Sequence, residues 1–196
     1  MTFKDYKFLV LSDLYRITDN LGIGSLFKHL IYGESFRYNF WMRTCKFSHG
    51  KRLLKYTLHP IARLIYSHYT YKMGISIPFT TDIGSGFYIG HFGGIVVNWR
   101  STIGKNCNIS HGVTLGQANR GRNKGYPIVG DDVYIGPGAK IIGAVKVGNN
   151  VAIGANCVVT KDIPDNSVVV GIPGKVISQE GSEGYVERTD YTDKIR

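Results

Sequence analysis

The chain has 196 residues, of which 43% are hydrophobic and 19% are charged, as in soluble globular proteins. No stretch approaches the ~20 apolar residues of a transmembrane helix, and Lys and Asp interrupt the only apolar run near Met1, so we expect neither a signal peptide nor an anchor. The three cysteines are odd in number and widely spaced, which favours reduced thiols and a cytoplasmic location over a disulfide framework.

The net charge of +10 is unevenly distributed along the chain. Residues 1–72 carry 12 Lys and Arg against 4 Asp and Glu, together with 15 of the 24 aromatic residues. A basic, aromatic segment suits an anionic membrane surface or an acidic substrate. It also suits a helical cap that packs its aromatic side chains inward, and we favour this interpretation because most amphipathic segments face a core. Peripheral association with the inner face of the membrane stays open, and we expect no nucleic-acid partner.

Residues 1–74 have a helical pattern, with apolar residues recurring at threes and fours. Residues 20–24 and 49–51 are typical of breaks between helices, and Pro60 is placed to start or kink the last one. We predict an N-terminal subdomain of three or four short helices.

After Gly74 the sequence repeats every six residues, with one step of eight after Ile95 and one of fourteen after Leu115. A glycine follows the repeated aliphatic residue at eight of thirteen positions. The thirteen aliphatic positions are Ile77, Ile83, Ile89, Ile95, Ile103, Ile109, Leu115, Val129, Ile135, Ile141, Val147, Ile153 and Val159.

This period predicts a solenoid in which each hexad forms a short strand and a turn, with the glycine helping the chain round the corner. Three hexads close a triangular coil, and about four coils stack through parallel hydrogen bonds at ~4.8 Å. Six residues cannot hold a crossover helix, which excludes βαβ units. Cys107 and Cys157 fall at inward positions, so we expect buried structural thiols. The solenoid is predicted over residues 75–177 and a tail over 178–196.

The repeat region resembles the hexapeptide-repeat acyltransferases, and within them the serine acetyltransferase-like branch. The resemblance implies a mainly β, left-handed parallel β-helix, acetyl-CoA as donor, and a homotrimer with active sites between subunits. The N-terminal helices, including SDLYR (Ser12–Arg16), more loosely resemble those of sugar-modifying members. The matching segments are FYIGHFGGIVV (Phe87–Val97), VTLGQ (Val113–Gln117), VYIGPGAKIIGAVKVG (Val133–Gly148), VAIGANCVVTKDIP (Val151–Pro164) and GIPGKVI (Gly171–Ile177).

The repeat frame places two histidines at one corner of adjacent coils. His91 is the third residue of the hexad begun by Ile89, and His111 is the third residue of the hexad begun by Ile109, three hexads later. The next third residues are Pro137 and Ala155. Two imidazoles followed by a narrow, uncharged track suit a pantetheine arm that lies along the axis.

The setting of His91 matches the family's catalytic histidine. A neutral imidazole can accept a proton from an acceptor hydroxyl as the oxygen attacks the thioester, and backbone N–H groups can stabilise the oxyanion. His111 stands where the serine enzymes usually have Gln, so we assign it a supporting or substrate-facing role in catalysis. The other four histidines have no clustered partners, and we expect no metal site.

The fourteen-residue step predicts a loop over residues 117–127, rich in Gly and basic residues, that covers the site as a lid. Lysines near the end of the solenoid are placed to meet the phosphates of the coenzyme. The predicted coenzyme contacts are Gly116, Arg120, Tyr126, Pro137, Ala155, Lys161 and Lys175.

The acceptor is indicated by residues that the serine enzymes have and this chain lacks. Gly90 and Ser76 stand where aspartates would be expected, and Gly125 and Tyr126 replace an Arg-His pair. An amino acid's ammonium and carboxylate need opposite charges or strong donors. We therefore favour a sugar hydroxyl of a capsule or exopolysaccharide unit as acceptor. Serine O-acetyltransferase of cysteine biosynthesis is the alternative, and an inactive hexapeptide scaffold is a third interpretation.

Overall fold

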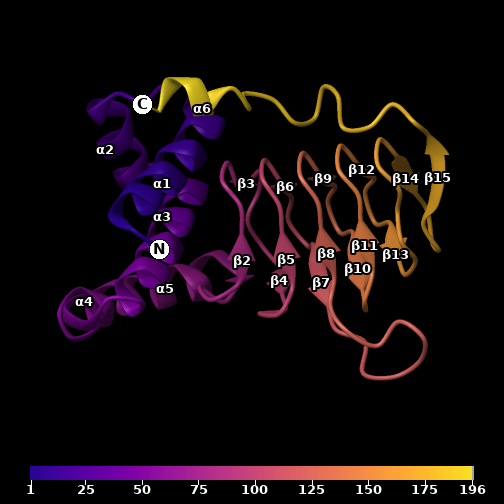
Figure 1. Ribbon diagram of the computed structural model, residues 1–196, viewed down its shortest axis with the longest axis horizontal. Coiled ribbons are helices and arrows are strands. Elements are labelled where there is room, and N and C mark those ends of the chain that lie inside the picture. Colours follow the sequence, from indigo (N-terminus) through magenta and orange to yellow (C-terminus); the bar gives the residue numbers. More distant parts are fainter. Residues whose placement is uncertain (196) are drawn as a thin grey trace.

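The computed structural model describes residues 1–195 and shows a helical cap on one end of a long β-solenoid (Figure 1). The cap has five helices rather than three or four. The additional break lies at Gly33, between α2 and α3, where a side chain would not fit because a Cβ atom would lie 2.7 Å from the backbone oxygen of His29. The helices of the cap are α1 (Phe3–Thr18), α2 (Ile23–Ile31), α3 (Glu34–His49), α4 (Arg52–Tyr56) and α5 (Leu58–Met73).

Helix α3 packs against both α1 and α5 and carries the buried centre of the cap. Phe36 and Tyr38 on α3 are at most 1% exposed. The expectation that the aromatic residues pack inward holds only for part of the cap, because α2 has no buried residue and presents Ile23, Phe27 and Ile31 to solvent.

The solenoid consists of three sheets whose strands are contributed in turn by successive coils (Figure 1). All pairings are parallel except that of the last two strands, β14 and β15. The first sheet contains β1 (Ile75–Ser76), β4 (Ile95–Val97), β7 (Thr114–Gly116), β10 (Lys140–Ile142) and β13 (Val158–Val159). The second contains β2 (Asp82–Ile83), β5 (Thr102–Ile103), β8 (Ile128–Val129) and β11 (Lys146–Val147). The third contains β3 (Tyr88–Ile89), β6 (Asn108–Ile109), β9 (Tyr134–Ile135), β12 (Ala152–Ile153), β14 (Val168–Val170) and β15 (Lys175–Ser178).

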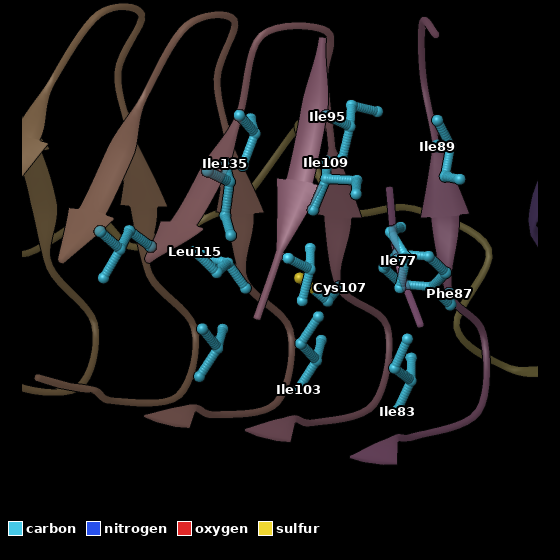
Figure 2. Packing of buried hydrophobic residues seen from close by; sticks show 14 of the residues in the cluster. Ile77, Ile83, Phe87, Ile89, Ile95, Ile103, Cys107, Ile109, Leu115 and Ile135 are labelled. Atoms are coloured by element: carbon cyan, nitrogen blue, oxygen red, sulfur yellow. The ribbon is translucent and has the colours of Figure 1, made fainter. Parts of the chain in front are cut away.

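The interior of the solenoid is the predicted column of aliphatic side chains (Figure 2). Each of the thirteen repeat positions is at most 4% exposed. Cys107 and Cys157 are fully buried in the same column, as the repeat predicted. This dry column holds the coils in register because a slipped strand would expose its aliphatic residue.

The register corrects one step of the predicted frame. Val97, not Ile95, pairs with Leu115, while Ile95 pairs with Ile75. The step of eight therefore runs from Ile89 to Val97, and its two extra residues lie in the turn that contains His91. Ile95 and Val97 are both buried, which is why the sequence alone did not distinguish them.

The glycines that follow the aliphatic residues serve a purpose other than turning the chain. They do not have positive φ angles, but at Gly130 a Cβ atom would lie 2.7 Å from the Gly148 oxygen of the next coil. They provide room for close stacking of coils. The left-handed φ values that turn the corners belong to other residues, namely Gly86, Asn106, Asp132, Asn150 and Asn166 at one corner and Gly94, Gly112, Gly138 and Asn156 at another.

The C-terminal segment runs back along the third sheet from β15 to the helical cap and ends in α6 (Tyr191–Lys194) (Figure 1). Tyr185 stacks on Tyr134 with ring centroids 4.5 Å apart. Tyr191 is 2% exposed, and its hydroxyl lies 2.9 Å from Ser85 Oγ and donates to Asn106. The segment thereby ties the cap to the coils.

Candidate active site

His91 and His111 lie on adjacent coils at the corner between the third sheet and the first. The pairing of Ile89 with Ile109 sets them in register. Their ring centroids are 6.1 Å apart with planes at 69°, and both side chains are exposed. The predicted juxtaposition of the two imidazoles is present.

The same corner continues as the predicted uncharged track. Ile135 pairs with Ile109 and Ile153 pairs with Ile135, which places Pro137 and Ala155 above the histidines. The backbone of the corner is joined from coil to coil: Gly138 donates to the carbonyl of His111 at 2.9 Å, and Asn156 donates to that of Pro137 at 2.8 Å.

The turn around His91 is wider than the turns above it because of its two extra residues. It rejoins the regular corner at Gly93, whose carbonyl accepts from Gly112 at 2.7 Å, and at Gly94, which has a φ of 65°. His91 and Phe92 are thus carried outward, and Phe92 is 41% exposed.

Within residues 1–195, neither imidazole receives or makes a hydrogen bond or an ion pair with another residue of the same chain. Ser76, which stands where an aspartate would be expected, has no hydrogen bond to either imidazole within residues 1–195. It lines a cavity of about 410 Å³ between α5 and the first coils, with Arg63 and Trp99. Within one chain, only the conformation of the backbone turn determines where the His91 side chain lies.

Three predicted coenzyme contacts lie at the opposite edge of the first sheet from the histidines. Gly116 ends β7, and the loop after it is held by paired hydrogen bonds between Ala118 and Gly125. Tyr126 accepts a hydrogen bond from Arg100 at 2.8 Å, and the guanidinium also lies over its ring. Arg120, in the same loop, is exposed. One chain alone does not bring these residues to the His91 corner.

Lys161 and Lys175 are exposed at the far end of the solenoid, on different elements. Lys161 follows β13 of the first sheet, and Lys175 begins β15 of the third sheet. Neither side chain has a hydrogen-bond or ionic partner within residues 1–195.

The buried thiols offer no nucleophile to this corner. Burial raises the pKa of Cys107 to about 12 and that of Cys45 to about 11, and it also raises the pKa of Cys157. Since only a thiolate attacks a thioester, these cysteines are unsuited to carry an acetyl group.

Sequence reasoning missed a group of residues beside this corner. Arg16 of α1 and Arg188 of the C-terminal segment line one cavity with Tyr88 and Asn108 of the third sheet. The motif SDLYR contains Arg16, but nothing in the repeat pattern shows that residues 184–188 fold back over it.

Among residues 1–195, no helix is both long enough and apolar enough to cross a bilayer.

Comparison with known protein families gives a match to the family "Bacterial transferase hexapeptide (six repeats)" over residues 126–161. A serine acetyltransferase of Staphylococcus aureus is 36% identical over 170 residues, which cover 87% of this chain and 71% of that protein. A serine acetyltransferase of Bacillus pumilus is 40% identical over 129 residues, 66% of this chain. The matched region spans only 59% of the Bacillus protein's length and 60% of that of the Mycobacterium tuberculosis relative.

Solved structures of serine acetyltransferases are also similar to this chain. The serine acetyltransferase of Neisseria gonorrhoeae is 28% identical with a TM-score of 0.72, over 90% of this chain and 68% of that one. A Brucella abortus serine acetyltransferase in complex with coenzyme A is 26% identical with a TM-score of 0.73, over 91% and 70% of the two chains. The likeness confirms the left-handed parallel β-helix with an N-terminal helical region.

Proposed function

Because the chain belongs to the hexapeptide-repeat transferases, the family of the serine acetyltransferases, we propose that it transfers an acetyl group from acetyl-CoA to a hydroxyl. The observation that carries this proposal is the pair of exposed imidazoles, 6.1 Å apart, at the base of a narrow track of small side chains. The solved relative with bound coenzyme A supports the choice of donor.

His91 acts as the general base in this proposal. Its neutral ring nitrogen accepts the hydroxyl proton while the acceptor oxygen forms a bond to the thioester carbon. The tetrahedral intermediate collapses as the carbon–sulfur bond breaks, and the imidazolium returns the proton to the leaving thiolate. The products are an acetyl ester and free coenzyme A. No enzyme-bound acetyl group is needed, which agrees with the raised pKa values of the buried thiols.

The active site is proposed to form between subunits of a homotrimer. The His91 corner and the 117–127 loop lie at opposite edges of the first sheet, so a single chain presents two halves of a site. A neighbouring subunit related by rotation can place its loop against this chain's histidines.

L-Serine is the acceptor that the names of the relatives favour. A sugar hydroxyl is the second candidate, and it rests on a specific observation. Neither imidazole has an acidic partner within residues 1–195, and Gly90 and Ser76 offer no charge to an ammonium group. A neutral acceptor does not need those charges.

An acceptor screen tests the proposal. Acetyl-CoA is supplied with L-serine or with a panel of sugars, sugar nucleotides and capsule oligosaccharides, and the release of free thiol is followed with mass-spectrometric identification of the product. We expect thiol release that depends on one acceptor class. Coenzyme A binding without transfer to any acceptor would favour the inactive-scaffold interpretation.

The exposed apolar face of α2 supports peripheral membrane association as a further part of the proposal. Ile23, Phe27 and Ile31 lie four residues apart on one side of the helix, in the basic part of the chain. Co-sedimentation with vesicles that contain anionic lipid, but not with neutral vesicles, is the expected result. The Phe27→Ser variant should lose it.

A further inference from the structure

A cavity of about 290 Å³ lies between the end of α1, the outer face of β3 and β6, and the returning C-terminal segment. Its charged lining consists of Arg16, Arg188 and Glu187, and Tyr88 and Asn108 form the side of the sheet. The cavity thus has two basic residues and one acidic residue in its lining.

Arg16 is a buried cation without an acidic partner. It is 5% exposed and donates to the carbonyl of Glu187 and to Oδ1 of Asn108. Its Nε atom has no hydrogen-bond partner, and among residues 1–195 no carboxylate lies within ion-pair distance of it. Burial lowers its pKa because the charged form is desolvated. An anion bound in the cavity would offset the free-energy cost of burying the Arg16 charge.

The walls of the cavity are held in place before any ligand arrives. Asn108 donates through Nδ2 to the carbonyl of Tyr185 at 2.7 Å, and the Tyr185 ring stacks on Tyr134. Arg188 donates to the carbonyl of Ile17 at 2.8 Å, which keeps its guanidinium beside the end of α1. Two guanidinium groups that line one cavity, with Nε of Arg16 left without a partner, are suited to bind a phosphate or diphosphate.

The cavity lies on the same strands as the histidines. Tyr88 pairs with Asn108, and His91 and His111 follow three residues later, in the turns after β3 and β6. A Tyr88 ring carbon lies 3.6 Å from the place that a Cβ of Gly90 would occupy, so the ring borders the residue before His91. Tyr88 therefore lines the cavity of the two arginines and also borders the residue before His91.

We propose that Arg16 and Arg188 bind the phosphate or diphosphate group of the acceptor, with the sugar beside Tyr88 and its hydroxyl at His91. The inference rests on the proposed function and selects a phosphorylated sugar as acceptor. Two sources share this chemistry, a soluble sugar nucleotide and a polyprenyl-diphosphate-linked sugar. The donor approaches the histidines from the other side, along Pro137 and Ala155.

The first test measures anion binding without catalysis. Inorganic pyrophosphate is titrated by calorimetry into the His91→Ala protein at fixed ionic strength, with coenzyme A at saturation. We expect one saturable site per chain and an affinity about tenfold or more weaker in Arg16→Gln and in Arg188→Gln. The exposed Arg52 on α4 provides a matched control, and Arg52→Gln should bind as tightly as the parent.

Absence of saturable pyrophosphate binding in the presence of saturating coenzyme A, or equal affinity in the Arg188→Gln protein, would overturn the inference. Arg16 is buried, and its variant can lose stability. The rim residue Arg188 is exposed and keeps the test decisive.

The second test compares acceptors that share one sugar: the free sugar, its nucleoside diphosphate and its short-chain polyprenyl diphosphate. Arg188→Gln should raise KM for the diphosphates about tenfold relative to the KM for the free sugar. The better of the two diphosphates identifies the source. Pyrophosphate binding without acetylation of any acceptor would refute the proposed function and leave the anion site standing. Efficient acetylation with equal KM values for free and diphosphate sugar would refute the anion site alone.

Discussion

Arg43 joins the cap to the first coil from the middle of α3. Its guanidinium pairs with Asp13 of α1, with Nε–Oδ2 at 3.0 Å, and donates to the carbonyls of Ile83 and Gly84. Asp13 in turn accepts from the backbone N–H of Phe87 at 2.8 Å. Both side chains are at most 2% exposed, so neither charge has water as an alternative partner.

Replacing Arg43 by Met should therefore lower the free energy of unfolding by about 3–5 kcal/mol, because it leaves the Asp13 carboxylate buried and unpaired. Urea denaturation followed by circular dichroism measures the change. Lys46→Met on the same helix is the control: Lys46 pairs with the exposed Asp82 at 3.4 Å, and its loss should cost less than about 1 kcal/mol. Equal effects of the two substitutions would contradict this account of Arg43.

The corner histidines show which properties of single residues the sequence reveals. The register of His91 above His111 follows from the spacing of Ile89 and Ile109 and was predictable. The bulged turn around His91 was not, because Ile95 and Val97 are equally apolar and either fits the column. The contacts of Arg16 depend on a segment 171 residues away in sequence, which no local pattern encodes.

At the scale of the element, the hexad is a unit of coil stacking. Several of the glycines that follow an inward aliphatic residue lie close to the backbone of the next coil, and at Gly130 the nearest atoms of that coil lie 2.7 Å from the position that a Cβ atom would occupy. A side chain there must push the coils apart.

Gly130→Ala should therefore destabilise the solenoid by about 1–3 kcal/mol through overpacking. Gly24→Ala is the matched control, since a Cβ at this position of α2 meets nothing within 4 Å. Alanine is the better helix former, so this variant should gain up to about 1 kcal/mol. Thermal unfolding of both proteins checks the pair. A Gly130→Ala protein as stable as the parent would refute the stacking role.

The solenoid was predictable from sequence because a six-residue period fixes both strand and turn. For the cap, only its helical secondary structure was predictable. Its helices follow from the apolar spacing, but the separation of α2 from α3 depends on the crowded Gly33, and the exposure of α2 depends on tertiary packing. Helix propensity alone predicts neither the break between α2 and α3 nor the exposure of α2.

At the scale of the whole molecule, one chain carries both halves of the proposed site but holds them apart. The loop residues Arg120 and Tyr126 and the track residues Pro137 and Ala155 lie at different corners. If a neighbouring subunit joins them, sedimentation equilibrium should give three times the mass of one chain. Mixed trimers of inactive His91→Ala chains and inactive loop-deleted chains should regain part of the activity. A monomer with full activity would contradict the intersubunit site.

The most direct test of the central claim compares the rate of thiol release from acetyl-CoA by the parent protein and by His91→Ala, at saturating acceptor. Loss of the general base should lower kcat about 10²–10⁴-fold and leave the affinity for coenzyme A unchanged. A variant that turns over at nearly the parent rate would remove His91 from the mechanism, and with it the assignment of this corner as the active site.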